Sequence, residues 1–216
     1  MPRSLDVQLQ ETTRRLRSLV SEVDHLVSDA LIKLKVPSFA AEEHAEERQR
    51  RVYRLKRELE DHVFFTMASY PPVANDLCFL ATVLSVVRDL GHMADCATRI
   101  REGAPDIGRG SASLEQLALL SQRTAAEGFV AVFRLDFNHP GSRSPMPWER
   151  LEAIVAGRSE AAALFKHVVA EPTPRNPPPS PAQLELRGAV ADTLVRVASL
   201  AADIADQLIL DRSRRG

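Results

Sequence analysis

The chain has 216 residues, of which 44% are hydrophobic and 26% charged, and its formal net charge is −1. This length and hydrophobic fraction are enough for a buried core in one domain or in two small ones. A nearly neutral charge gives no net attraction to nucleic acid or to an anionic membrane. We therefore expect no nucleic-acid partner.

The N-terminal segment MPRSLDVQLQETTRRL is charged and amphipathic, without the apolar core of a secretory signal. No run approaches the roughly 18 apolar residues of a membrane span, so no membrane insertion is expected. The two cysteines, Cys78 and Cys96, lie about 27 Å apart if one helix holds both, which is too far to pair. Unpaired cysteines suit a reducing compartment, and we expect a cytoplasmic protein.

The first two predicted helices are separated by proline. Apolar residues recur every three or four positions over residues 16–34, which predicts a first helix that stops at Pro37. A second helix is expected from about residue 40 to residue 69. The Tyr-Pro-Pro run at residues 70–72 ends it, because proline supplies no amide donor and biases the preceding residue away from the α region.

The second helix changes character along its length. Its first half carries five arginines interleaved with glutamates, a pattern that favours ion pairs within the helix over a nucleic-acid surface. These arginines are Arg48, Arg50, Arg51, Arg54 and Arg57. Its second half is apolar, and we expect Phe64, Phe65 and Met67 to enter the core.

The third helix is predicted to start on Pro72, which suits a first-turn position, and to reach about Arg101. Its buried stripe should consist of Val83, Leu84, Val87 and Leu90.

The second half of the chain repeats this plan. A glycine-rich loop at residues 103–113 precedes a fourth helix, which Ser113 and Gln116 should cap and which should reach about residue 137. A fifth helix is expected from Pro147 to about residue 170. The proline-rich segment 171–181 can form neither helix nor central strand. Ser180 and Gln183 then form a capping box for a sixth helix that starts at Pro181.

No alternating run of β-branched residues bounded by turns occurs between these elements. The predicted fold is therefore all-α, with six helices arranged as two tandem three-helix bundles. The predicted domains are residues 1–103 and 112–216.

This plan and the segment of residues 72–100 together resemble the PhoU family of bacterial phosphate-signalling regulators. The family's first repeat typically reads QPVAxDLRxIxxxLKxxxDLERIGDHAxNIA, and RLKRELED at residues 54–61 is similar to its second helix. Asp203-Ile204-Ala205-Asp206 resembles the NIAE of the second repeat. The matching positions of the first repeat are Pro72-Val73-Ala74, Asp76-Leu77, Asp89-Leu90, Asp95, Ala97 and Ile100. The resemblance implies a PhoU-like fold of spectrin-like repeats.

The same resemblance implies metal sites that this chain has altered. PhoU proteins hold clustered metal ions on paired motifs in which two carboxylates lie four residues apart on one helix face. Gly91 stands at the leading position of the first motif, where only Asp95 remains. Val195 and Ser199 stand at both positions of the second. We therefore do not expect the family's metal sites to be intact.

A different metal site remains an alternative. His92, Asp95 and Cys96 have ligand chemistry suited to zinc or another borderline ion, and Asp89 is near enough in sequence to orient the imidazole. This hypothesis predicts a single divalent or transition metal ion as the cofactor.

The competing interpretation of this cluster needs no ion. Asp95 would pair with Arg88 or Arg99 on a solvated face, and Cys96 would pack as a small apolar side chain. Two arginines on one face also repel a cation.

No nucleophile has a local motif that places a base beside it, so no enzyme activity is expected. The functional hypothesis therefore follows from the family resemblance. PhoU similarity implies a regulatory adaptor that restrains phosphate uptake and phosphate-starvation signalling. Its implied partners are a sensor histidine kinase and the ATPase subunit of the phosphate importer, and it is commonly a homodimer. Arg50, Arg54, Arg57 and Asp76 are the candidate partner-binding residues. A single-site metal-binding protein and a divergent scaffold for an unrelated assembly are the alternatives.

Overall fold

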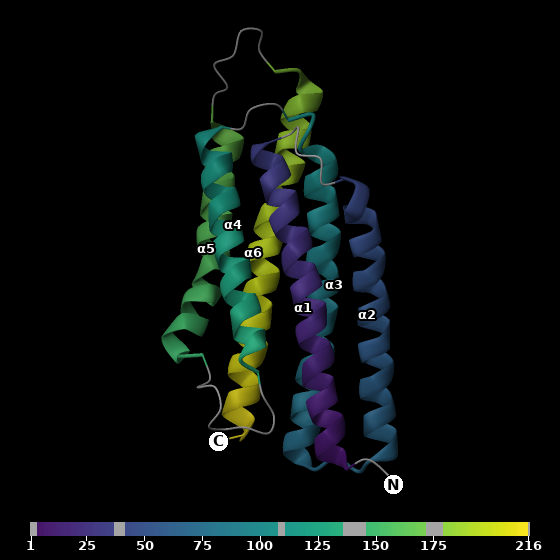
Figure 1. Ribbon diagram of the computed structural model, residues 1–216. Coiled ribbons are helices and arrows are strands. Elements are labelled where there is room, and N and C mark those ends of the chain that lie inside the picture. Colours follow the sequence, from purple (N-terminus) through teal and green to yellow (C-terminus); the bar gives the residue numbers. More distant parts are fainter. Residues whose placement is uncertain (1–3, 37–41, 108–110, 136–145, 172–178, 216) are drawn as a thin grey trace.

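The computed structural model describes residues 4–36, 42–107, 111–135, 146–171 and 179–215. Within these residues it contains six helices and no strand, which confirms the all-α prediction. Figure 1 shows two groups side by side, α1 to α3 and α4 to α6, with α2 and α5 on the outside. The helices are α1 (Leu5–Lys35), α2 (Glu42–Ser69), α3 (Ala74–Gly103), α4 (Ala112–Phe133), α5 (Trp148–Ala170) and α6 (Pro181–Arg215).

The start of α3 differs from the sequence prediction. The helix begins at Ala74 and Val73 is its N-cap, so Pro72 precedes the helix instead of occupying its first turn. The carboxylate of Asp76 accepts a hydrogen bond from the backbone N–H of Val73 at 3.2 Å. Asp76 is only 7% exposed, and it satisfies a backbone donor that the first helical turn leaves unpaired.

The second group contains one shifted cap and one correct one. Ser111, not Ser113, is the N-cap of α4, and its hydroxyl accepts a hydrogen bond from Leu114 N at 3.2 Å. At the start of α6 the predicted capping box is confirmed. Gln183 N donates to Ser180 Oγ at 3.2 Å, and Ser180 N donates to Gln183 Oε1 at 3.0 Å.

The two groups share one continuous hydrophobic core. Its buried residues include Val83, Val87 and Leu90 as predicted, while Leu84 is only partly buried. The division into domains at residues 1–103 and 112–216 stays a prediction.

The inner helices α3 and α6 join the two groups along their length, and they run antiparallel. Thr82 Oγ1 donates to Asp211 Oδ1 at 3.4 Å near one end of this contact. Near the other end, a Cβ on Gly103 would stand 2.7 Å from Val190 Cγ2, so the helices approach closely there. The edge helices are less embedded. Among the described residues, α2 packs only on α1 and α3, and α5 only on α4 and α6.

A buried arginine ties together the helix ends of the second group. Arg187 of α6 donates from Nη2 to Ser111 Oγ at 2.7 Å and to the carbonyl oxygen of Val168 at 3.0 Å. The same nitrogen lies 3.5 Å from Glu171 Oε2. One guanidinium thus connects the start of α4, the end of α5 and the body of α6.

The expectation about membrane spans needs one correction. Of the helices that the structure describes, α3 alone is long and apolar enough to cross a membrane by length and composition. However, 61% of its most apolar window is buried inside the bundle. This burial is what the core helix of a helical bundle requires.

Candidate functional site

The cluster on α3 separates into side chains that face different neighbours. Asp89 is 3% exposed and turns towards α6, where its Oδ2 accepts a hydrogen bond from Gln207 Nε2 at 2.7 Å. Its Oδ1 accepts from Arg88 Nε at 3.2 Å. His92 is exposed to solvent. Asp89 therefore bonds to neighbours other than the His92 imidazole that it was expected to orient.

Asp95 faces α2. Its carboxylate accepts a hydrogen bond from the hydroxyl of Tyr53, and this bond raises the pKa of the tyrosine. Among the described residues, no ion pair joins Asp95 to Arg88 or Arg99. Arg88 pairs with Asp89 instead, and α2 packs on α3. The predicted ion pair of Asp95 is thus replaced by a contact between helices.

Cys96 is 2% exposed, and burial raises the pKa of its thiol to about 11. Cys96 therefore packs as the small apolar side chain that the competing interpretation expected. Across the described ranges, no three His, Cys, Asp or Glu side chains are placed to hold a metal ion. The predicted set of His92, Asp95 and Asp89 is not brought together.

The glycine of the first motif lies under a lysine. A Cβ built on Gly91 would stand 3.1 Å from Lys56 Cε and 3.2 Å from Lys56 Cδ. The Lys56 ammonium bonds to Glu60 Oε1 at 2.7 Å. A side chain at position 91 would thus start in tight contact with the Lys56 side chain of α2.

The two positions of the second motif are Val195 and Ser199, so neither carries a carboxylate, and the Ser199 hydroxyl is already hydrogen-bonded. Ser199 Oγ donates to the carbonyl oxygen of Val195 at 2.9 Å. One turn further along α6, Arg158 Nη2 of α5 lies 2.6 Å from Asp203 Oδ1 and 3.2 Å from Asp206 Oδ2. Burial raises the pKa of Asp203, although Arg158 acts in the opposite direction. The residues of both motifs do not fit the clustered metal ions of the PhoU family.

The outer face of α2 consists of the side chains that point away from α1 and α3, and Arg50, Arg54 and Arg57 are exposed on it. Two of them take part in the predicted pairs within the helix: Arg50 lies 3.2 Å from Glu46, and Arg54 lies 4.0 Å from Glu58. Such exposed pairs contribute little to folding and leave the guanidinium groups open to other ligands.

Two other arginines of α2 reach across to α1 instead. Arg51 Nε lies 3.0 Å from Glu22 Oε1, and Arg48 Nη1 lies 3.4 Å from Glu22 Oε2. These two arginines hold α2 against α1, a role that the pattern of pairs within one helix did not predict.

The outer face of α2 also carries two aromatic rings. Phe64 and Phe65 are each 59% exposed, so the expectation that they enter the core is wrong. The contact stripe of α2 is formed by Val52, Leu59 and Val63, and the helical period turns the two phenylalanines away from it. In the part of the chain that the structure describes, no helix other than α1 and α3 packs on α2, so the two rings stay uncovered.

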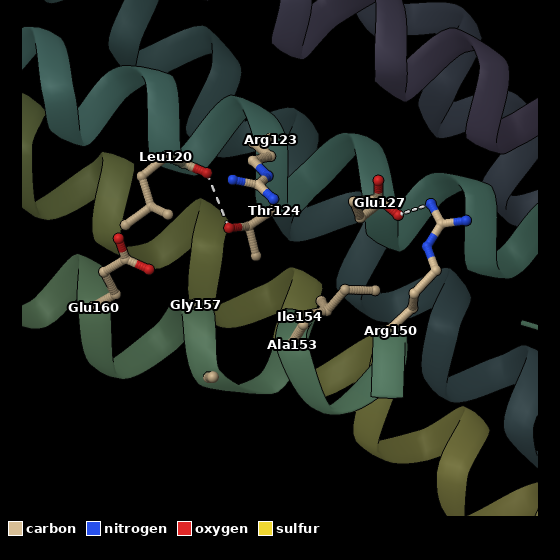
Figure 2. A pocket seen from close by; sticks show the side chains of 10 residues that line it. Leu120, Arg123, Thr124, Glu127, Arg150, Ala153, Ile154, Gly157 and Glu160 are labelled. Atoms are coloured by element: carbon tan, nitrogen blue, oxygen red, sulfur yellow. Dashed lines mark hydrogen bonds and ion pairs between the residues drawn. The ribbon is translucent and has the colours of Figure 1, made fainter. Parts of the chain in front are cut away.

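A groove of about 350 Å³ lies between α4 and α5 (Figure 2). Aliphatic side chains such as Ile154 form part of its wall, and an ion pair between Arg150 and Glu127 closes one end. Close approach of the helices depends on Gly157, since a Cβ there would stand 2.8 Å from Thr124 Oγ1. The groove offers space and fixed charges more than a reaction centre.

Comparisons with known proteins agree with this architecture. Residues 13–104 match the family model described as the PhoU domain. The crystal structure of PhoU from Pseudomonas aeruginosa has the same fold at 17% identity, with a TM-score of 0.83 over 97% of this chain and 99% of that chain. The phosphate transport system regulatory protein PhoU from Streptococcus pneumoniae gives 18% identity and a TM-score of 0.79, over 97% of each chain. A search among curated proteins found no match. The predicted resemblance to the PhoU family is confirmed.

Proposed function

Because this chain carries a PhoU domain at residues 13–104 within a PhoU fold, we propose that it is a regulator of phosphate transport that acts by binding other proteins. The similar protein from Streptococcus pneumoniae is described as a phosphate transport system regulatory protein, which supports this class of function. The match to the PhoU domain is the observation that carries the proposal.

The outer face of α2 is the docking surface that we propose. Arg54 and Arg57 lie on it with Phe64 and Phe65, and arginine and aromatic side chains are enriched at protein interfaces. Two rings that are each 59% exposed leave apolar area in water, and a partner that covered them would gain from its burial. The proposed partners are the sensor histidine kinase and the ATPase subunit of the phosphate importer.

Asp76, on the surface of the third helix, was also predicted to bind a partner, but its geometry favours another use. Its carboxylate is buried against the backbone of Val73, where it stabilises the start of α3. We therefore propose a positioning role for Asp76, since it fixes the start of α3, the helix on which α2 packs.

Regulation requires the adaptor to bind one state of its partner better than another. A protein that binds both states with equal affinity shifts neither population. In this proposal, the outer face of α2 engages one conformation of the importer ATPase or of the kinase, and release restores the other. No reaction on a substrate is needed, so the protein is not an enzyme in this scheme.

A pull-down tests the proposal. The purified chain is mixed with the phosphate-importer ATPase and, separately, with the sensor kinase, each from the organism that encodes this protein. We expect capture by the wild type and loss of capture by the double variant Arg54→Glu/Arg57→Glu. The matched control is Arg123→Glu/Lys166→Glu, which changes the same charge on exposed positions of α4 and α5.

The control separates the specific surface from net charge. If both double variants lose capture, electrostatic attraction of the whole chain and not the α2 face explains binding. If neither partner is captured by the folded wild-type chain, the proposed function is wrong.

Two further features belong to the same proposal. We expect a cytoplasmic location and a homodimer, in keeping with PhoU similarity. Light scattering coupled to gel filtration measures the second, and a mass near twice the 23.9 kDa of the chain is the expected result. A mass that stays at 23.9 kDa at every concentration tested would argue for a monomer.

A further inference from the structure

We infer that this protein folds and works without the clustered metal ions of the PhoU family, because a lysine of one edge helix lies against Gly91 and the remaining carboxylates Asp95, Asp203 and Asp206 are bonded to side chains of the edge helices. The inference concerns the residues around Gly91, Asp95 and Ser199, and it does not depend on the identity of the regulated partner.

The first step is the crowding of position 91 by a lysine side chain. Lys56 covers this point of α3, with its Cε and Cδ atoms 3.1 and 3.2 Å from where a Cβ would stand. With contacts this short, the lysine must shift by a few tenths of an ångström to admit a side chain at position 91. Lys56 is also held in place by its bond to Glu60 at 2.7 Å.

The second step concerns the ligand that remains. The Asp95 carboxylate is already bonded to the Tyr53 hydroxyl. Tyr53 and Lys56 are neighbours on one face of α2, three residues apart, so both reach α3 within one turn. One turn of the edge helix therefore accounts for both positions of the first motif.

The third step concerns the second repeat, where an arginine binds the carboxylates that follow the altered motif. Arg158 from the edge helix α5 binds both Asp203 and Asp206, the carboxylates next to the altered motif of α6. Its guanidinium supplies positive charge to these oxygens without an ion.

The charged groups around both motifs also disfavour binding of a metal cluster. A cluster of hard cations needs several carboxylates to neutralise it and oxygen ligands to coordinate it. Asp95 in the first repeat already has a donor in Tyr53, and Asp203 in the second repeat has one in Arg158. Lys56 and Arg158 also bring fixed positive charges that repel a divalent cation.

Metal content and thermal unfolding test the inference on the full chain, purified without a histidine tag. We expect substoichiometric Mn, Fe and Zn by elemental analysis. The Tm should not change with EDTA or with added Mn²⁺ or Zn²⁺, since an ion bound only to the folded state would raise it. One or more ions per chain, with a Tm lowered by EDTA, would overturn the inference.

A rebuilt motif tests the role of Lys56 directly. The double variant Gly91→Glu/Lys56→Ala restores the carboxylate and clears its space, so we expect Mn²⁺ or Zn²⁺ to raise its Tm. Gly91→Glu alone, with Lys56 in place, should show a smaller shift. Gly188→Glu is the control, because it adds the same charge to α6 where nothing lies within 4 Å.

The outcomes are distinct, provided that circular dichroism shows each variant to be helical. Equal shifts in the single and double variants would show that Lys56 does not block the site. The same shift with Gly188→Glu would show that any added carboxylate binds the ions. No shift in the double variant would show that clearing this space does not recover a ligand set. Each of these results would overturn the assigned role of Lys56.

Discussion

The inner helices α3 and α6 and the edge helices α2 and α5 differ in what their side chains face. The inner helices contact each other and both halves of the bundle, whereas each edge helix contacts only two helices of its own group. Val83, Val87 and Leu90 of α3 are fully buried, while α2 leaves Phe64 and Phe65 largely in water. Position in the bundle, more than local hydrophobicity, decides which apolar residues form the core.

The edge helices also supply the charged groups that meet the inner helices. Lys56 of α2 covers Gly91, and Arg158 of α5 pairs with Asp203 and Asp206. The remaining charged face of α2 is free for contacts outside the chain. An edge helix can thus cover an inner helix on one side and expose charged and aromatic side chains to solvent on the other.

The largest effect should come from the inner helices. Leu90→Ala removes a fully buried side chain of α3, and we expect the free energy of unfolding to fall by about 2–5 kcal/mol. Urea denaturation followed by circular dichroism measures this change. Leu210→Ala on the exposed side of α6 is the control and should stay within about 0.5 kcal/mol of the wild type. An equal loss of unfolding free energy in both variants would contradict the expectation that buried positions of the inner helices carry more of the stability than exposed ones.

A smaller effect is expected where an edge helix approaches its neighbour. Gly157→Ala places a methyl group 2.8 Å from the Thr124 hydroxyl, which is fixed by its bond to the Leu120 carbonyl at 2.9 Å. We expect a loss of about 1–3 kcal/mol in the free energy of unfolding. Gly188→Ala meets nothing within 4 Å and should gain up to about 1 kcal/mol from helix propensity. A stable Gly157→Ala variant would mean that α4 and α5 can separate without cost.

The contact between α2 and α1 should respond to pH. Burial lowers the pKa of His62 below its usual value of 6.5, and its ring nitrogen lies 3.2 Å from the Gln8 carbonyl oxygen. Below pH 6.5 the unfolded chain takes up a proton that the folded chain resists, so stability falls as the pH drops from 6.5 towards the lowered pKa. We expect His62→Gln to reduce this slope in urea denaturation at several pH values. His92→Gln, at an exposed position, should keep it.

The smallest effect on stability belongs to the outer face of α2. Arg54 and Glu58 are both exposed and their charged atoms are 4.0 Å apart, so Arg54→Ala should change the free energy of unfolding by less than about 0.5 kcal/mol. A double-mutant cycle with Glu58→Ala measures the coupling. A larger coupling energy would show that these charges serve the fold and would weaken their assignment to a partner.

Most of the fold was predictable because its signals are local. Helical periodicity and prolines placed six helices, and the Ser180 capping box is confirmed. The start of α3 was misplaced because Pro72 suits a first turn in sequence, whereas the carboxylate of Asp76 fixes the cap at Val73. Two serines compete in the same way before α4, and Ser111 is the cap.

The candidate site was less predictable because its contacts join different helices. Gly91 and Asp95 were recognisable from the motif, but their neighbours Tyr53 and Lys56 lie on another helix. The spacing of three residues between Tyr53 and Lys56 shows only that these two side chains share one face of α2. The sequence pattern does not give the register between helices, and it equally did not show that Phe64 lies on an uncovered side.

The α3 and α6 contact has a consequence for the integrity of the molecule. Two polar pairs, Thr82 with Asp211 and Asp89 with Gln207, join these antiparallel helices. They fix the register of one helix against the other, as polar pairs do in a subunit interface. The two groups of helices meet as two subunits would, but they belong to one chain. The covalent connection between α3 and α4 gives each group a high effective concentration with respect to the other. Two fragments divided between these helices would lose that advantage. They would also display to water the apolar surface that each half conceals from it.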